Sequence, residues 1–256
     1  MMKEKKMKRI KHILSFFYPL MVEAVNGDVT PFLEITRYKG KYHLNSLNAN
    51  YSFGSLHAIF DKLFREMHVG QYHFKNILIL GMGGGSIISL LRNKYHITAP
   101  ITAVEKDPVV IDLAARYFNI AHYRDLSIVK ADAYDFVCTS RDSYDLVIVD
   151  LFVDAVVPKI FASPEFLTHL RRITSDASCV IYNKMTEQSD HKSEFAELSE
   201  EFGRLFPGYR VIKVEANHSE NSLLYCNTAI TREPYEKDAF CEKPDSLSGQ
   251  LSGKVA

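Results

Sequence analysis

One stretch of the chain constrains its fold more than any other. Residues 77–80 are four consecutive apolar residues, and they run directly into a glycine-rich segment, Gly-Met-Gly-Gly-Gly-Ser, at residues 81–86. Apolar residues then recur at helical spacing. Glycine permits a sharp turn and a close approach of the backbone to a ligand, and the start of a helix offers unpaired N–H groups. The pattern predicts a nucleotide-binding strand, turn and helix, although a purely structural turn can look the same.

The chain from residue 76 to residue 205 alternates strand-like and helix-like segments. Apolar runs predict strands at 77–80, 101–104, 126–129, 146–149 and 179–182, and amphipathic segments predict helices at 86–95, 108–118, 134–140, 164–173 and 192–205. Such alternation is typical of parallel strands joined by right-handed crossovers. Residues 209–215 and 222–229 are both strand-like and are separated only by a turn, so they should pair as antiparallel neighbours. We therefore predict an α/β fold with a Rossmann-like seven-stranded sheet whose last strand is antiparallel.

The N-terminal part has a different pattern. Two strand-like segments, 32–38 and 41–44, flank a Lys-Gly turn, and the turn at residues 26–28 indicates a further strand before them. We predict a basic tail and a small β region of two to four strands in residues 1–54. The α/β domain then occupies residues 55–232, and the charged, Ser- and Gly-rich segment 233–256 is predicted to be poorly ordered. Residues 45–53 are polar and are interpreted as a loop, which either covers the ligand or simply connects.

Composition narrows the class of protein. With 256 residues, 46% of them hydrophobic, the chain can bury a full core. Its formal net charge of +0 favours neither a nucleic acid nor a membrane surface as partner. Basic residues 3–11 precede an apolar stretch, but Pro19 interrupts that stretch and Glu23 follows it, so we interpret it as a tail rather than a signal peptide.

The cysteines also carry information. Their spacing does not match a metal site, so no metal is expected, and scattered reduced thiols are typical of a cytoplasmic protein. The four positions are Cys138, Cys179, Cys226 and Cys241.

Three successive predicted strands end at a carboxylate. Glu105 ends the second strand, Asp132 follows the third, and Asp150 ends the fourth. In an open α/β sheet the ligand lies beyond the carboxyl ends of the strands. Glu105 comes a little over twenty residues after the glycine segment, where a carboxylate accepts hydrogen bonds from both ribose hydroxyls. Asp132 is interpreted either as a helix cap or, with Ala133, as the adenine site.

The end of the sheet decides between two adenosine-containing cofactors. A nicotinamide-binding domain usually continues its parallel sheet, whereas an antiparallel end and an adenine-site aspartate favour S-adenosylmethionine. The glycines would then surround the methionine portion, and Asp150, also a candidate cofactor-binding residue, would face the reacting group. These glycines are Gly81, Gly83, Gly84 and Gly85. The layout resembles that of the class I S-adenosylmethionine-dependent methyltransferases.

The resemblance can be narrowed further. Four segments in order resemble the spermidine synthase (polyamine aminopropyltransferase) family: ILILGMGGGS, AVEKDPVVIDLAARYF, VKADAYDFV and YDLVIVDLFVDAVVP, at residues 77–86, 103–118, 129–137 and 144–158. The following stretch, up to residue 172, also fits that family's loop and helix. The resemblance implies a small N-terminal β region, a donor that is S-adenosylmethionine or its decarboxylated form, and a possible homodimer.

The departures from that family bear on function. The family carries an aspartate in the glycine turn, where this chain has Gly84, and that carboxylate binds the amine of the aminopropyl donor. Its catalytic loop reads Asp-x-x-Asp-Pro, whereas here Asp150 is followed by Leu, Phe and Val before Asp154. A family tyrosine corresponds to Ser55. An aspartate at position 84 would repel the carboxylate of intact S-adenosylmethionine, so its replacement favours methyl transfer.

We therefore predict transfer of a methyl group to a small-molecule amine or hydroxyl. Asp150 and Asp154 are the candidate catalytic residues, which would orient or deprotonate the acceptor. Three candidates would line the acceptor side (Asn50, Tyr51 and Ser55), and His57 either joins them or only packs its helix. The alternatives are an aminopropyltransferase, a catalytically silent protein that binds an adenosyl ligand or a protein partner, and a disfavoured nicotinamide-dependent oxidoreductase.

Overall fold

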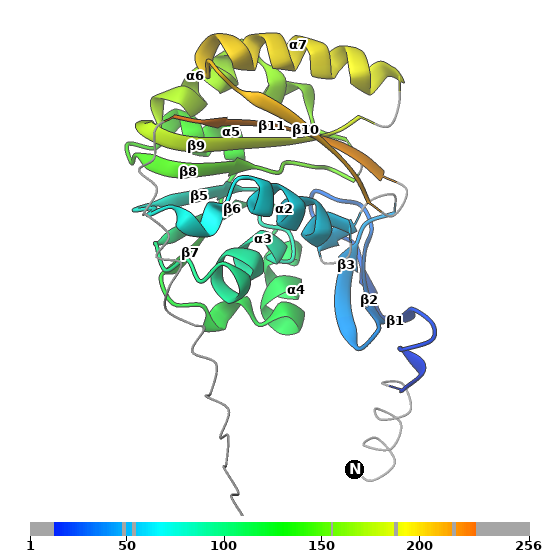
Figure 1. The fold of residues 1–256 in the computed structure, drawn as a ribbon. Coiled ribbons are helices and arrows are strands. Elements are labelled where there is room, and N and C mark those ends of the chain that lie inside the picture. The colour runs from blue at the N-terminus through cyan, green and yellow to red at the C-terminus, as the bar shows by residue number, and fades with distance from the viewer. Residues whose placement is uncertain are drawn as a thin grey trace, which may run out of the picture.

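The structure is a computed structural model that describes residues 13–47, 50–52, 55–154, 156–186, 189–216 and 219–228. It contains a seven-stranded sheet in the order β10-β11-β9-β8-β5-β6-β7 (Figure 1). The strands are β5 (Ile77–Leu80), β6 (Ile101–Glu105), β7 (Leu126–Lys130), β8 (Tyr144–Val149), β9 (Thr174–Met185), β10 (Arg210–Ala216) and β11 (Ser219–Asn227). All neighbours from β7 to β9 are parallel, and β11 is antiparallel to both β9 and β10. The predicted fold class is confirmed.

Helices cover both faces of this sheet (Figure 1). The helices are α2 (Ser55–Glu66), α3 (Ser86–Ser89), α4 (Pro108–Phe118), α5 (Ala133–Thr139), α6 (Pro164–Arg172) and α7 (Ser189–Leu205). One core lies between the sheet and α2, α3 and α4, and it includes Phe60, Phe64 and Ile88. The other lies under α5, α6 and α7 and includes Phe166 and Phe202. The strands of a sheet with helices on both faces must be apolar on both sides, which explains the uninterrupted Ile-Leu-Ile-Leu of β5.

The N-terminal region forms a separate four-stranded antiparallel sheet in the order β1-β2-β3-β4. Its strands are β1 (Leu20–Val25), β2 (Leu33–Tyr38), β3 (Lys41–Asn45) and β4 (Asn50–Ser52). Its apolar face packs on α4, where Leu33, Ile35 and Leu44 contact Val110 and Leu113. The predicted hairpin is present, and the β region reaches the upper limit of two to four strands.

Several predicted boundaries were wrong. Segment 45–53 is not only a loop, because β4 pairs with β3 within it. The predicted helix 86–95 changes after α3 into a π-helix, Leu90–Lys94, in which the Tyr95 N–H donates to Leu90 O. β9 starts five residues earlier than predicted, where Thr174 pairs with Tyr144 of β8, and β11 starts three residues earlier, where Ser219 pairs with Ala216 of β10.

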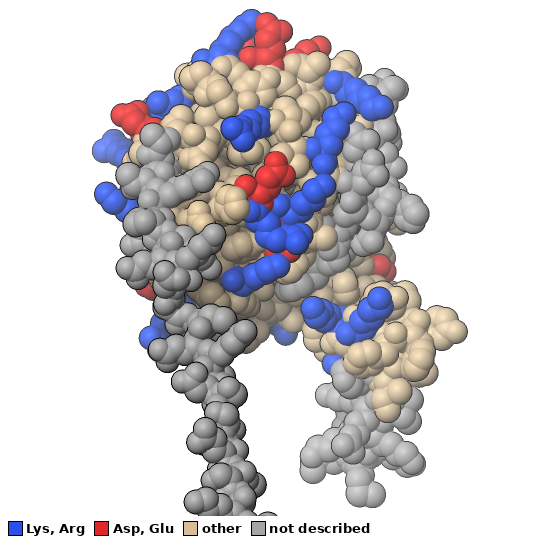
Figure 2. Space-filling model, viewed as in Figure 1, with Lys and Arg blue, Asp and Glu red and all other residues tan. Residues whose placement is uncertain are grey.

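Two expectations concern residues outside the described ranges. The basic tail at residues 3–11 and the poorly ordered tail at residues 233–256 stay predictions. Within the described ranges, no helix combines the length and apolar character needed to cross a membrane. On the face drawn in Figure 2, basic and acidic side chains are interspersed. One such group joins Asp61 to Lys94 at 2.6 Å and to Arg65 at 3.5 Å.

Candidate functional site

The parallel strands end in register at one edge of the sheet. Leu80 pairs with Val104 on one side and Val149 on the other, and Val149 pairs with Tyr182. The next residue of each segment therefore lies in one row across four strands. The residues of this row are Gly81, Glu105, Asp150 and Asn183. Ligands of open α/β sheets lie beyond this edge, so the row is the floor of the candidate site.

Position 81 requires a glycine because the end of the neighbouring strand lies very close to it. Its φ is +89°, and a Cβ there would lie 2.1 Å from the carbonyl oxygen of Asp150. An L side chain at this position would need a strained backbone and would displace the adjacent segment. The sequence pattern attributed this glycine to a ligand, whereas the structure assigns it first to the contact between two neighbouring strand ends.

The other glycines of the turn have different environments. Gly83, with φ of +52°, donates its N–H to Glu105 Oε2 at 3.1 Å, and Gly85, with φ of +82°, donates to Met82 O at 3.0 Å. Gly84 has no left-handed φ and is buried. Because the N–H groups of Gly81, Gly83 and Gly85 all have protein acceptors, Gly84 is the turn glycine whose N–H has no acceptor in the described part of the chain.

Backbone N–H donors hold the Glu105 carboxylate. Its Oε2 accepts from Gly83 N, and its Oε1 accepts from Asp107 N at 3.0 Å. Burial raises the pKa of Glu105, and the N–H groups of Asp107 and Gly83 oppose that rise. A carboxylate has about four acceptor positions, so the group can still accept a hydrogen bond from a ligand hydroxyl.

Asp107, which the sequence analysis missed, joins the two sheets. Its carboxylate caps α4 by accepting from Val109 N at 2.9 Å, and it also accepts from Val29 N at 3.0 Å and from Asp28 N and Thr30 N at 3.3 Å. Burial acts to raise the pKa of Asp107, but these N–H groups hold it below its usual value. The Asp-Pro pair at the start of a predicted helix was the signal for the cap. Nothing local signalled the contact with residues 28–30.

Asp132 acts as a helix cap in this structure. Its Oδ1 accepts from Tyr134 N at 2.7 Å, and its Oδ2 accepts from Lys106 Nζ at 2.9 Å. Burial alone would raise the pKa of Asp132, but Lys106 and the Tyr134 N–H lower it. Ala133 is the buried first residue of α5. Of the two interpretations of Asp132, the helix cap is present. The adenine contact stays a prediction; an adenine amino group would have to donate to Oδ2, the oxygen that also accepts from exposed Lys106.

Asp150 has an unusual environment. Its Oδ1 accepts from Asn183 Nδ2 at 2.8 Å, and Asn183 Oδ1 accepts in turn from Asn221 Nδ2 at 3.0 Å. Burial raises the pKa of Asp150 to about 7, and the Asn183 amide acts in the opposite direction. A carboxylate with a pKa near neutrality can accept a proton from a reacting group at physiological pH.

Asp154 contacts the N-terminal sheet. Its Oδ1 accepts from Ser46 Oγ at 2.5 Å, and its backbone has a left-handed φ of 55°. The segment after β8 is thereby connected to the end of β3. The structure brings together Gly81, Glu105 and Asp150, and it places Asp154 at the junction of the two sheets; a catalytic role for Asp154 stays a prediction.

The remaining candidates contribute less. His57 is half-buried in α2, and this burial lowers its pKa, as expected for a packed helix histidine. The side chains of residues 50, 51 and 55 lie outside the described part. Cys179 and Cys226 are buried, Cys138 is half-buried, and Cys241 is outside the described residues. Among the side chains that the structure describes, no group of three or more His, Cys, Asp or Glu could hold a metal ion.

Comparison with known protein families shows to which family the chain belongs. Residues 63–214 match the family described as the spermine/spermidine synthase domain, which is more than half of the chain. The chain belongs to this family. A probable polyamine aminopropyl transferase from Bifidobacterium longum is 30% identical over 180 residues, 70% of this chain and 36% of that protein. An eEF1A lysine and N-terminal methyltransferase homolog from Drosophila melanogaster is 28% identical over 163 residues, 59% of this chain and 23% of that protein.

This member of the spermine/spermidine synthase family thus spans well under half the length of these two relatives. Among solved structures, spermidine synthase from Thermotoga maritima has a TM-score of 0.64 at 16% identity, covering 83% of this chain and 74% of that one. Human methyltransferase-like protein 13 in complex with SAH has a TM-score of 0.55 at 20% identity, covering 73% and 86%. These likenesses show a common fold. Which reaction this chain performs is a separate question.

Proposed function

We propose that the protein binds S-adenosylmethionine and transfers its methyl group to an amine or hydroxyl of a small-molecule acceptor. The observation that carries this proposal is Gly84, a glycine with an N–H donor and no side chain at the turn position where the family resemblance implies an aspartate. Relatives named for aminopropyl transfer and for methyl transfer support group transfer without distinguishing the two.

Charge is the physical reason for choosing between donors. Intact S-adenosylmethionine has a carboxylate on its methionine portion, whereas the decarboxylated form has lost it and keeps only cationic groups. Backbone N–H groups attract an anion, and an aspartate attracts a cation and repels a carboxylate. A turn that offers the Gly84 N–H and no carboxylate therefore suits the intact donor.

The rest of the row fits an adenosyl ligand. Glu105 lies in the row where a carboxylate would accept the ribose hydroxyls, and Asp132 with Ala133 lies two residues beyond β7 for the adenine. The donor supplies an electrophilic methyl group on a sulfonium. Asp150 orients the acceptor and takes its proton as the acceptor's bond to the methyl carbon forms and the S–CH₃ bond breaks, which releases the neutral thioether. Correct alignment of acceptor and donor provides much of the rate enhancement.

Aminopropyl transfer is the second candidate. It is favoured by the 30% identity to a probable polyamine aminopropyl transferase, and it would use the same Glu105 and Asp150 with decarboxylated S-adenosylmethionine. The two candidates differ in which donor binds more tightly, so binding can separate them before the acceptor is known.

The test is calorimetric titration with each donor. We expect intact S-adenosylmethionine to bind at least about tenfold more tightly than the decarboxylated form, a difference of about 1.4 kcal/mol. The Gly84→Asp variant should lose this preference, whereas Gly84→Asn, which adds a side chain of the same size without charge, should keep it. Neither substitution requires a left-handed φ, because φ at Gly84 is not left-handed. Tighter binding of the decarboxylated donor by the unmodified protein would establish the second candidate instead.

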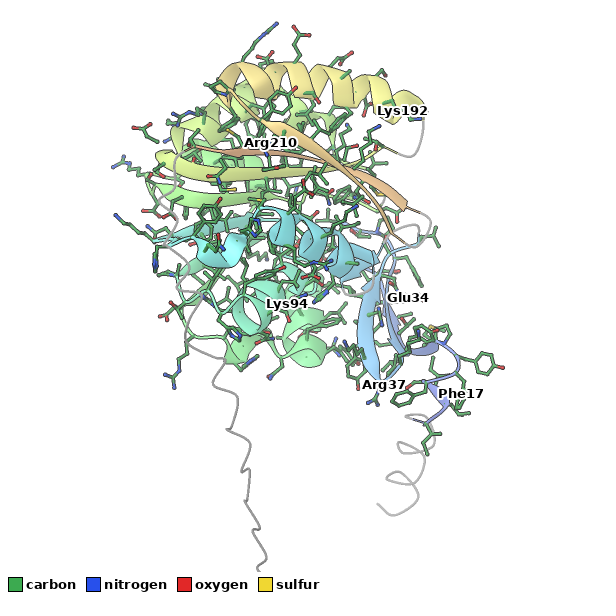
Figure 3. All side chains as sticks on the ribbon, in the orientation of Figure 1. Phe17, Glu34, Arg37, Lys94, Lys192 and Arg210 are labelled. Atoms are coloured by element: carbon green, nitrogen blue, oxygen red, sulfur yellow. The ribbon has the colours of Figure 1, made fainter. Side chains whose placement is uncertain are left out.

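The homodimer expected from the family resemblance also stays a proposal, for which an exposed apolar segment supplies a surface. Residues 13–18, here called the N-terminal arm, precede β1, and their exposed fractions are 51% for Phe16, 70% for Phe17 and 69% for Tyr18. Figure 3 shows Phe17 in this arm, at the end of the molecule away from the large sheet. β1 is also an edge strand, and two identical edges can pair around a two-fold axis. The cytoplasmic location, and the lack of a nucleic-acid or membrane partner, stay predictions from composition.

A further inference from the structure

We propose that Asn183 and Asn221 are positioning residues that orient the carboxylate of Asp150 toward the acceptor. This inference rests on the proposed function for its role in transfer, but not for the geometry itself. Asn221 Nδ2 donates to Asn183 Oδ1 at 3.0 Å, and Asn183 Nδ2 donates to Asp150 Oδ1 at 2.8 Å. We call this chain of two hydrogen bonds the amide relay.

The sheet register brings the three residues together. Val149 pairs with Tyr182 in the parallel ladder of β8 and β9, so Asp150 and Asn183 are the next pair. In the antiparallel ladder of β9 and β11, Asn221 is opposite Met185, two residues beyond Asn183. Residues two apart on a strand lie on the same face of the sheet, so all three side chains can meet across three strands.

The relay also determines which end of the Asn183 amide faces Asp150. Asn183 is fully buried and Asn221 is 4% exposed, so neither side chain has free access to water. If the Asn183 amide were reversed, its oxygen would face the Asp150 carboxylate and its NH₂ group would face the Asn221 donor. Each buried group would then lack a partner, which is unfavourable. By holding the Asn183 oxygen, Asn221 keeps the Asn183 NH₂ group directed at Asp150.

Two consequences follow for Asp150. Its Oδ1 is occupied by Asn183, which leaves Oδ2 to accept a hydrogen bond and then the proton from the acceptor. A donor to the ionised form also stabilises the carboxylate against its burial, so the relay keeps part of the Asp150 population ionised near neutral pH. Without the relay, a smaller fraction of Asp150 would be ionised at neutral pH, and less of the protein could use it as a base.

The hydroxyl pair next to the relay offers a matched control. Thr186 Oγ1 and Ser222 Oγ lie 2.9 Å apart, are buried, and also join β9 to β11, but they do not contact Asp150 in the described hydrogen bonds. Ser222→Ala removes a buried polar contact between the same two strands as Asn221→Leu. Any effect on Asp150 that only the asparagine variants produce is therefore due to the relay and not to weaker strand pairing.

The experiment measures the titration of Asp150 directly in the full-length protein without any acceptor, by NMR of ¹³C-labelled aspartate carboxyls, with the signal assigned from Asp150→Asn. We expect the Asp150 pKa to rise by about one unit in Asn183→Leu, to rise less in Asn221→Leu, and to be unchanged in Ser222→Ala. An unchanged pKa in Asn183→Leu, with the fold intact by circular dichroism, would overturn the relay.

A second measurement keeps this inference distinct from the proposed function. Once an acceptor is found, the acidic limb of the kcat/KM profile should move to higher pH in Asn183→Leu, by the same amount as the NMR titration, with unchanged affinity for S-adenosylmethionine. If NMR shows the shift but the protein transfers no methyl group, the relay stands and the proposed function fails. If methyl transfer occurs with an unshifted pH profile, the relay has no role in catalysis and the inference fails.

Discussion

The edge of the large sheet and the N-terminal region differ in what they bury and what they expose. At the edge, Asn183 and Asn221 are buried, Asp150 is half-buried, and all three have hydrogen-bond partners on neighbouring strands. In the N-terminal sheet and arm, large apolar side chains such as Phe17 are exposed, and the region is joined to the main domain mainly by a small apolar contact and by the polar contacts of Asp107 and Glu23. Burying polar groups costs free energy, so a cluster of buried polar side chains indicates a functional site. Exposed apolar area instead indicates a surface that binds another molecule.

The largest effect should come from the point where two strand ends touch. Gly81→Ala places a Cβ 2.1 Å from Asp150 O at a left-handed φ, and we expect it to lower the free energy of unfolding by more than about 4 kcal/mol, measured by urea denaturation. The control is Gly84→Ala in the same turn, whose φ is not left-handed and whose cost should be below about 1 kcal/mol. Equal effects at the two glycines would show that the edge is not as tightly packed as the structure indicates.

The second effect tests how the N-terminal sheet is attached. Asp107→Ala removes one helix cap and the acceptor for the N–H groups of residues 28–30, and we expect a loss of about 3 kcal/mol together with faster proteolysis of the N-terminal sheet. Asp112→Ala, on the exposed side of the same helix, should change stability by less than about 0.5 kcal/mol. If proteolysis of the two variants is the same, the apolar contact alone holds the sheet.

A third prediction concerns the buried carboxylate and its pH dependence. Because the folded pKa of Asp150 is raised to about 7, the folded state binds its proton more tightly than the unfolded state. The stability from this group is complete below its unfolded pKa and is lost as pH rises toward 7. Asp150→Asn lacks this loss, so its unfolding free energy relative to the unmodified protein should rise by about 2–3 kcal/mol between pH 5 and pH 8, while transfer is abolished. A difference independent of pH would contradict the burial of a titrating carboxyl at this edge.

The smallest effect on stability is expected in the N-terminal arm. Phe17 is 70% exposed, so Phe17→Ser should change the free energy of unfolding by less than about 0.5 kcal/mol. It should nevertheless shift the proposed homodimer toward monomer in analytical ultracentrifugation. Phe60→Ser, in the main core, would instead lower stability strongly. An unchanged association state in Phe17→Ser would remove the arm from the proposed interface.

The sequence predicted the row at the sheet edge well for a simple reason. Each strand of the parallel sheet is an apolar run that ends where the chain must leave the core, so the first polar residue after it marks the edge. Glu105 and Asp150 were found in this way. Asn183 was missed because β9 continues through Met185, and a polar residue within a strand does not mark its end.

Local pattern thus determined the alternation of strands and helices, the glycine turn and the carboxylates at the strand ends, because each depends on residues close together in the chain. Contacts between segments that are distant in the sequence were decided only by the tertiary structure. Asp107 with residues 28–30, Ser46 with Asp154, and Asn221 with Asn183 are 77–79, 108 and 38 residues apart. Hydrogen bonds across such separations depend on sheet order and register, and no periodicity within a segment encodes them.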